Sequence, residues 1–147
     1  MTNNEPLRPP PSRRILRRIG AVFAGLVLIV ALDISFDVIM HATGVYPPWF
    51  QPMSTGLWLL AISYRVIDGI AGSYLTARLA PNRPLAHALV LGLIGLLLST
   101  AGLLATWGKG PEFGPKWYPI LVVVIALPCA FIGGTLRQRQ VQPARNR

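Results

Sequence analysis

The chain has 147 residues, of which 52% are apolar and only 13% are charged, and its formal net charge is +9. A soluble domain carries roughly 25% charged residues, so this composition argues against a water-soluble fold. The basic residues gather at the chain ends and in one short turn, which favours a lipid bilayer as partner and predicts no nucleic-acid binding.

Four apolar stretches are each long enough to cross roughly 30 Å of hydrocarbon, which takes about 20 helical residues. They cover residues 19–40, 56–77, 85–106 and 118–136. Turns that contain Pro separate them, whereas the basic segments 1–18 and 137–147 contain Pro and predict disordered tails. The predicted fold is an all-α, integral membrane four-helix bundle.

The first apolar stretch follows Ser12-Arg13-Arg14, a pattern that also occurs in cleaved secretory or twin-arginine leaders. Cleavage would leave three helices. The stretch exceeds the usual 7–15 residues of a leader core, and no small-residue cleavage site follows it. We therefore expect an uncleaved first helix.

The basic residues predict the orientation of the chain in the membrane. With four crossings, eleven of the fourteen Lys and Arg residues fall on one side, and only Lys109 and Lys116 fall on the other. The positive-inside rule then places both termini in the cytoplasm. The four Trp residues gather at the opposite boundary, where amphipathic rings are expected. They are Trp49, Trp58, Trp107 and Trp117.

Four charged residues interrupt the first two apolar stretches: Asp33, Asp37, Arg65 and Asp68. Charged side chains inside a membrane normally face protein or water. Asp33 lies nine residues below Ala42 and Arg65 nine below Gly56, so both are expected on the order of 13 Å deep and are predicted partners. The four groups can form one cluster. Fully ionised, it would carry a charge of −2, so at least one Asp is expected to be protonated.

The cluster allows two interpretations. In the first, it is a static clamp between two helices of an accessory or structural membrane protein of unknown activity. In the second, it is the coupling site of a small proton- or ion-coupled transporter or channel, because intramembrane carboxylates also mark proton pathways. A membrane enzyme ranks third, because no nucleophile elbow, phosphate loop or dinucleotide motif occurs, and we predict no enzymatic activity.

His41 follows Asp37 by one helical turn near the predicted outer interface, where it could respond to pH or be an ordinary solvated histidine. His87 lies at the other side of the membrane. The two cannot share a metal ion, and Cys129 is the only cysteine, so we predict neither a metal site nor a cofactor.

Small residues line one face of the third apolar stretch and part of the second, and such faces let membrane helices approach closely. In the third stretch they are Ala88, Gly92, Gly95, Ser99 and Gly102, and in the second they include Gly69 and Gly72. They predict packing within the chain, and contact between copies in a homo-oligomer is the alternative.

Residues 72–81 are Gly-Ser-Tyr-Leu-Thr-Ala-Arg-Leu-Ala-Pro, and Arg83-Pro84, His87-Ala88 and Leu91-Gly92 follow. This turn resembles that of a group of small, uncharacterised four-helix bacterial inner-membrane proteins, and the layout is similar over most of residues 20–136. The resemblance implies fold and location but no activity, substrate or catalytic residue. Arg78 and Arg83 in the turn are expected to lie at anionic lipid head groups.

Overall fold

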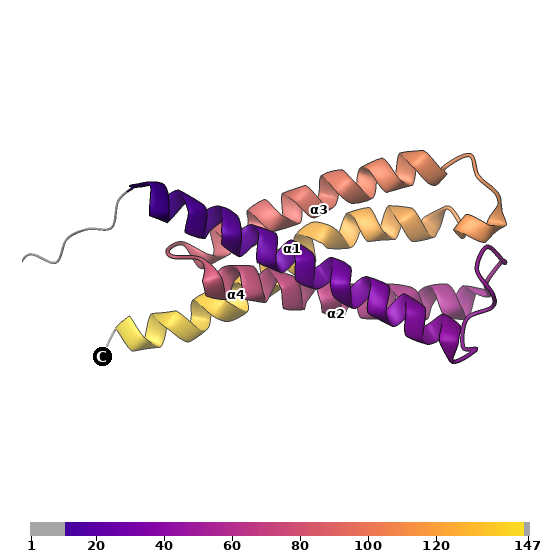
Figure 1. Cartoon of the computed structure of the whole chain (residues 1–147), viewed down its shortest axis with the longest axis horizontal. Coiled ribbons are helices and arrows are strands. Elements are labelled where there is room, and N and C mark those ends of the chain that lie inside the picture. The colour runs from indigo at the N-terminus through magenta and orange to yellow at the C-terminus, as the bar shows by residue number, and fades with distance from the viewer. Residues whose placement is uncertain (1–10, 146–147) are drawn as a thin grey trace, which may run out of the picture.

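A computed structural model describes residues 11–145, and over these residues the chain is all-α, as the sequence predicts (Figure 1). A short 3-10 turn, η1 (Pro111–Phe113), precedes the last helix. The four long helices are α1 (Pro11–Ala42), α2 (Thr55–Leu79), α3 (Pro84–Thr106) and α4 (Trp117–Arg145).

Among the described residues, three helical segments are long and apolar enough to cross a membrane: Arg13–Ala42, Pro84–Thr106 and Pro111–Val141. Only 11%, 17% and 22% of the residues in their apolar windows are buried by the rest of the protein. A water-soluble protein does not leave this much apolar surface uncovered, whereas a bilayer covers it. The sequence predicts four such segments, so the finding agrees for three of them.

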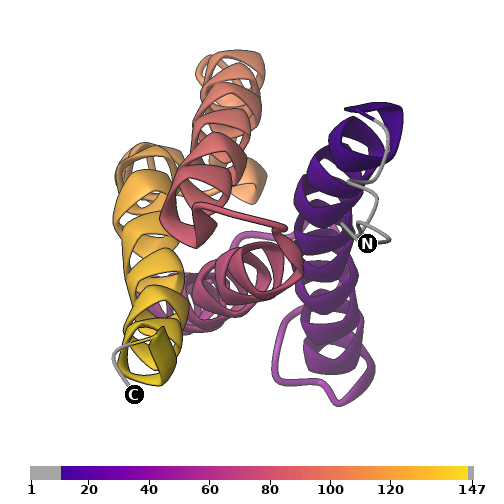
Figure 2. The same ribbon diagram turned by 90° about the vertical axis from the view of Figure 1, so that its left-hand side faces the viewer.

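The remaining helix, α2, lies in the middle of the structure (Figure 2). It packs against α1 on one side and against α3 and α4 on the other. Its buried residues include Tyr64, Asp68, Ser73 and Thr76, so protein covers much of its polar surface. A helix that is shielded in this way needs less apolar surface than one that faces lipid.

Glycines allow α1 and α4 to approach α2 closely. A Cβ on Gly72 would overlap the Ile29 side chain and lie 2.7 Å from the carbonyl oxygen of Gly25. On the other side, a Cβ on Gly133 of α4 would lie 2.8 Å from the Cβ of Ser73. Both contacts require a bare backbone, which is how membrane helices approach each other in the absence of a hydrophobic driving force.

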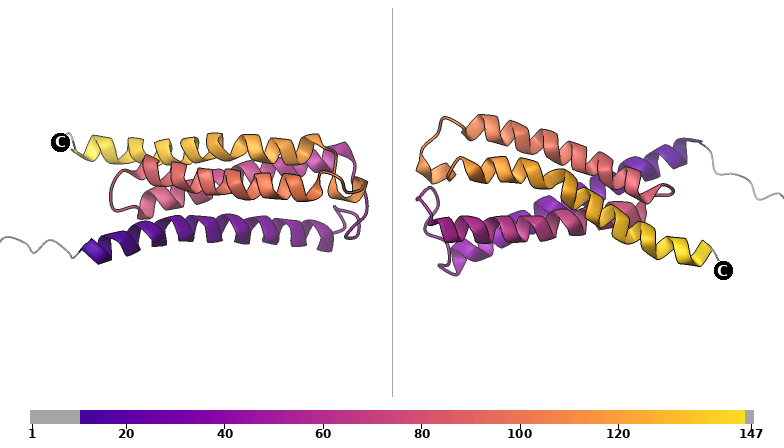
Figure 3. Two further views of the ribbon diagram at one scale, coloured as in Figure 1. Left: turned by 90° about the horizontal axis from the view of Figure 1, so that it is seen from above. Right: turned by 180° about the vertical axis from the view of Figure 1, so that it is seen from behind.

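The helices extend further than the sequence predicts. Residues 11–18 and 137–145 are helical, so the prediction of disorder is wrong for them; residues 1–10 and 146–147 lie outside the described part. Pro is tolerated at the first position of a helix, and Arg and Gln are good helix formers, so each helix continues beyond its apolar stretch. α4 also bends along its length (Figure 3), and Pro128, which cannot donate a backbone hydrogen bond, lies near its middle.

The two ends of the molecule differ in composition. The start of α1, the α2–α3 turn and the end of α4 lie at one end, and the connections 43–54 and 107–116 lie at the other (Figure 3). Arginines gather at the first end, which we call the basic end. Trp49, Trp58, Trp107 and Trp117 belong to the second, which we call the loop end.

Candidate functional site

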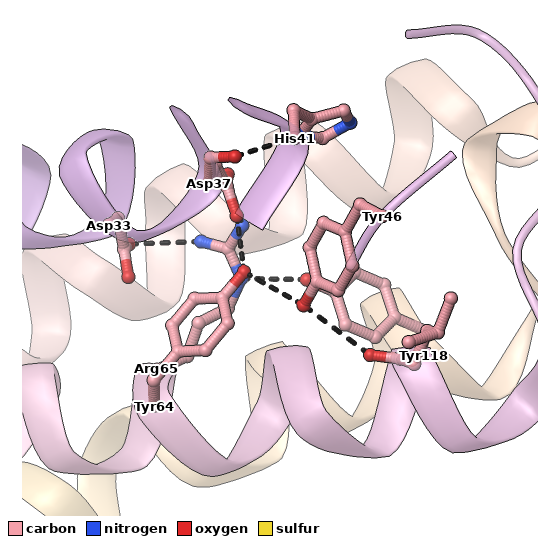
Figure 4. Close-up of polar contacts among 8 residues, drawn as sticks. Asp33, Asp37, His41, Tyr46, Tyr64, Arg65 and Tyr118 are labelled. Carbon is pink, nitrogen blue, oxygen red and sulfur yellow. Dashed lines mark hydrogen bonds and ion pairs between the residues drawn. The ribbon is translucent and has the colours of Figure 1, made fainter. Parts of the chain in front are cut away.

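Arg65 of α2 stands at the centre of a network of polar groups (Figure 4). Its Nη1 lies 3.0 Å from Asp33 Oδ2 and its Nη2 lies 3.1 Å from Asp37 Oδ2. Its Nε donates a hydrogen bond of 2.6 Å to the hydroxyl of Tyr118 on α4. Asp33 and Asp37 are one turn apart on α1, so both carboxylates face the same guanidinium. One side chain thus joins α1, α2 and α4.

Two further tyrosines complete the network. The Tyr64 hydroxyl donates to Asp37 Oδ1, so both oxygens of this carboxylate have a partner. Tyr46, in the α1–α2 connection, donates a bond of 3.3 Å to the Tyr64 hydroxyl. Tyr46 and Tyr64 are only 3% and 5% exposed, and buried hydroxyls need such partners.

The three tyrosines were missed in the sequence, where only charged residues were considered as members of the cluster. A usable signal exists, because a tyrosine within or next to an apolar stretch has to find a partner for its hydroxyl when buried. Tyr64 precedes Arg65 directly, and Tyr118 begins the last apolar stretch. Tyr46 gives no comparable signal, since it lies in a connection between helices.

Asp68 is also buried, at 1% exposure, but it does not pair with Arg65. Among the described residues, neither of its carboxyl oxygens has a hydrogen-bond partner, and the same holds for Asp33 Oδ1. The two carboxyl groups are neighbours. Two ionised carboxylates can only accept hydrogen bonds and repel each other, so one shared proton would relieve this repulsion. The expected protonation of one Asp stays a prediction.

Two cavities meet at Arg65. The first, the loop-end cavity, has a volume of about 280 Å³ and is lined by Asp37, His41 and several aromatic residues. The second, the central cavity, has about 230 Å³ and lies among the four helices, with Asp33 and Cys129 in its wall. Arg65 lines both. The ion pairs with Asp33 and Asp37 therefore stand between the two spaces.

The small residues predicted to pack on α3 divide into two groups. Near the basic end, Ala88 is fully buried, and a Cβ on Gly92 would overlap Ala130 of α4. Further along, a Cβ on Gly95 would only just touch α4, at 4.0 Å from the Ala126 Cβ. The packing is therefore close over half of the predicted face.

The other half of this face borders open space. Ser99 lines the central cavity and donates its hydroxyl hydrogen bond, 3.1 Å long, to the carbonyl of Leu96 in its own helix. A Cβ on Gly102 would have nothing within 4 Å. In α2, a Cβ on Gly69 would lie 3.1 Å from the Cys129 Cβ of α4, whereas a Cβ on Gly72 would meet α1. The two predicted packing glycines of α2 therefore contact different helices.

His41 contacts Asp37 through the main chain. Its Nδ1 lies 2.7 Å from the Asp37 carbonyl oxygen, which can only accept, so Nδ1 carries the hydrogen. Its ring stacks on Trp49 with a centroid separation of 3.5 Å and meets the Tyr46 ring edge-on at 5.3 Å. Within residues 11–145, no group of three His, Cys, Asp or Glu side chains could hold a metal ion.

The fold and the site define an all-α protein with three helices long and apolar enough to span a membrane and an ionic network between α1, α2 and α4. No family model matches the sequence, and comparison with curated proteins and with solved structures finds no match for it.

Proposed function

We propose that the chain is a multi-pass protein of the bacterial inner membrane, with four crossings and both termini in the cytoplasm. It acts as an accessory or structural membrane component in which the Arg65 network holds the helices together. The resemblance of its second turn to small four-helix inner-membrane proteins supports this location. The basic end, with Arg78 and Arg83 in the α2–α3 turn, would then lie at anionic lipid head groups.

The main support for a structural role is the number of partners that the Arg65 side chain contacts. The Arg65 guanidinium contacts two carboxylates of α1 and one hydroxyl of α4 within 3.1 Å. Side-chain exposures of 24% for Arg65, 23% for Asp33 and 27% for Asp37 show that protein covers about three quarters of each group. A network of this kind stabilises one arrangement of helices, because each group would be left unpaired in another.

Thiol labelling in intact bacterial cells tests the orientation. In a Cys129→Ala background, a single new cysteine is placed at Gln51 in the loop end or at Asn82 in the α2–α3 turn, both of which are exposed. A membrane-impermeant maleimide is expected to label Gln51→Cys in intact cells and Asn82→Cys only after permeabilisation. The reverse pattern would refute the orientation, and labelling of both sites in intact cells would refute the four crossings.

A second candidate function is proton-coupled transport, and one observation favours it. The loop-end and central cavities approach Arg65 from two directions, and the buried Asp68 carboxyl, which has no described partner, lies next to Asp33. Two neighbouring carboxyl groups that can share a proton, one of them in the wall of the central cavity, resemble the proton relays of membrane transporters. Four helices enclose little volume, so a transporter of this kind would be a homo-oligomer.

Reconstituted vesicles test this second candidate. A pH gradient is imposed and the decay of a lumenal pH dye is recorded for the wild type, for Asp68→Asn and for Ser35→Ala. Ser35 is exposed and hydrogen-bonds only to a carbonyl of its own helix. Transport predicts proton flux that Asp68→Asn abolishes and Ser35→Ala preserves. Vesicles that stay as tight as protein-free ones would eliminate the second candidate and leave the first intact.

A further inference from the structure

The loop-end cavity has an unusual lining. Seven of its fifteen lining residues are Phe, Tyr or Trp, although the whole chain has only thirteen such residues. They come from three parts of the chain: the α1–α2 connection, the first turns of α2, and the segment around η1 and the start of α4. The aromatic belt of a membrane protein faces lipid outward, whereas these rings surround a space of about 280 Å³.

The rings are held in place by one another. Trp49 stacks on His41 at 3.5 Å, Trp58 packs against Tyr118 with centroids 4.5 Å apart, and Tyr64 is fixed by its bond to Asp37. Trp58 is only 9% exposed. Phe50 also lines the cavity, is 79% exposed and has a φ of 64°, a backbone conformation that is strained for an aromatic residue. Contacts with neighbouring residues thus hold Trp49, Trp58 and Tyr64 in the lining.

The charged side chains of the lining include one carboxylate without an ion pair. Arg65 is the only Lys or Arg residue in the lining, and it pairs with Asp37. Glu112 also lines the cavity, and it has no salt-bridge partner in the part of the chain that the structure describes. The lining residues themselves therefore carry an excess of one carboxylate, and Lys109 is a cation beside the lining, against Phe113.

We propose that the loop-end cavity binds a small organic cation, an alkylammonium or quaternary ammonium group, against its aromatic rings and near Glu112. Aromatic faces attract cations through their quadrupole, and cages of several rings are the usual receptors for quaternary ammonium groups. One ring at the edge already has such a partner, because the Lys109 ammonium lies 4.6 Å from the centroid of Phe113. The site needs no particular orientation in the membrane and no transport activity.

An anionic ligand fits this cavity poorly. The donors of Arg65 are directed at Asp33, Asp37 and Tyr118, so an anion would have to displace partners within 3.1 Å and would then face Glu112 at close range. A neutral apolar ligand could use the rings but not the negative charge. Comparing a cation with its uncharged isostere therefore separates the proposed site from a merely apolar one.

The test is equilibrium binding of radiolabelled choline to the purified full-length protein in detergent micelles, at constant ionic strength. Saturable binding is expected, and excess tetramethylammonium should displace it. An equal excess of 3,3-dimethylbutan-1-ol, the uncharged carbon isostere of choline, should not. Equal displacement by the alcohol, or no saturable binding, would overturn the proposal.

Three variants locate the site. Trp49→Leu is expected to weaken choline binding by about 2- to 30-fold through loss of a cation–π contact. Trp107→Leu is the matched control, because Trp107 lies at the same end of the molecule but outside this cavity, and it should change the Kd less than twofold. Glu112→Gln should weaken binding by about two- to fivefold. Glu112 makes no described side-chain hydrogen bond or ion pair, so this variant tests the site even if Trp49→Leu fails to fold. Equal effects of the two Trp variants would place the binding elsewhere.

Discussion

The ion pair between Asp33 and Arg65 can be tested by a double-mutant cycle. The effect of Asp33→Asn on the unfolding free energy is expected to differ between the wild type and the Arg65→Leu background. Arg65→Leu leaves two carboxylates of α1, about one quarter exposed, without their cation. Removing one partner of a fully buried ion pair costs about 3–5 kcal/mol, and the partial exposure here lowers the expected cost to about 2–4 kcal/mol. Asp33→Asn is milder, at about 1–2 kcal/mol, because Asp37 and Tyr118 still hold the guanidinium.

In the Arg65→Leu background the same Asp33→Asn change removes a charge that has lost its partner. It also removes the repulsion between Asp33 and Asp37, which are one turn apart on α1. We therefore expect Asp33→Asn to be neutral or stabilising in this background. The coupling between the two sites should be about 1–3 kcal/mol, within the range measured for residues in direct contact.

The measurement is unfolding of the purified protein in mixed micelles with increasing SDS, followed by far-UV circular dichroism. Arg78→Gln provides a matched control, since Arg78 lies in the same helix but thirteen residues, or about 20 Å, further on. Asp33→Asn and Arg78→Gln should add within about 0.5 kcal/mol. If Asp33→Asn and Arg65→Leu were equally additive, the 3.0 Å contact would contribute nothing and the clamp would be refuted.

Three further predictions concern packing, hydrogen bonding and pH. Gly72→Leu should lower the unfolding free energy by about 2 kcal/mol or more. Gly102 has open space around it, so Gly102→Leu should change the unfolding free energy by less than about 0.5 kcal/mol. Equal losses for the two variants in SDS unfolding would contradict the close packing at Gly72. Tyr118→Phe removes a 2.6 Å hydrogen bond from a guanidinium and should cost about 1.5–3 kcal/mol. Tyr74→Phe, which removes a solvent-exposed bond to Gln140, should cost less than about 1 kcal/mol in the same SDS unfolding assay. Burial raises the pKa of Tyr46, so its contribution to stability is complete below the ordinary tyrosine pKa of about 10 and is lost as pH rises through the raised value. Tyr46→Phe should therefore make the loss of stability above about pH 10 less steep in SDS unfolding followed over this pH range.

The pairing of Asp33 with Arg65 could be predicted because a helix has a constant rise per residue. Asp33 and Arg65 each lie nine residues from the α1–α2 connection, counted from Ala42 and from Gly56, so they were expected side by side on the two helices. The structure brings them into contact. The alignment of Asp37 with the same guanidinium follows from the four-residue spacing on α1. These features depend only on distance along a helix, which the sequence contains in full.

Features that depend on how helices are arranged around each other could not be predicted. Asp68 lies one turn from Arg65, but it faces Asp33 at a contact of α2 with α1. Gly69 and Gly72 are three residues apart, but Gly69 packs against α4 and Gly72 packs against α1, because other helices surround α2 on several sides. The helical extensions at residues 11–18 and 137–145 were missed because Pro content was given more weight than the propensity of the Arg and Gln residues around it.

The central place of α2 connects the ionic network with the cavity at the loop end. A helix that carries Arg65 and Asp68 cannot present these residues to lipid, so the more apolar helices have to surround it. That arrangement places Arg65 in the lining of a space whose aromatic rings come from the two connections, from α2 and from the start of α4. Arg65→Leu should therefore lower both stability and choline affinity, because it releases Asp37 and the tyrosine fixed by it. Glu112→Gln should lower choline affinity alone, and a loss of stability in that variant would contradict the separation of the two roles.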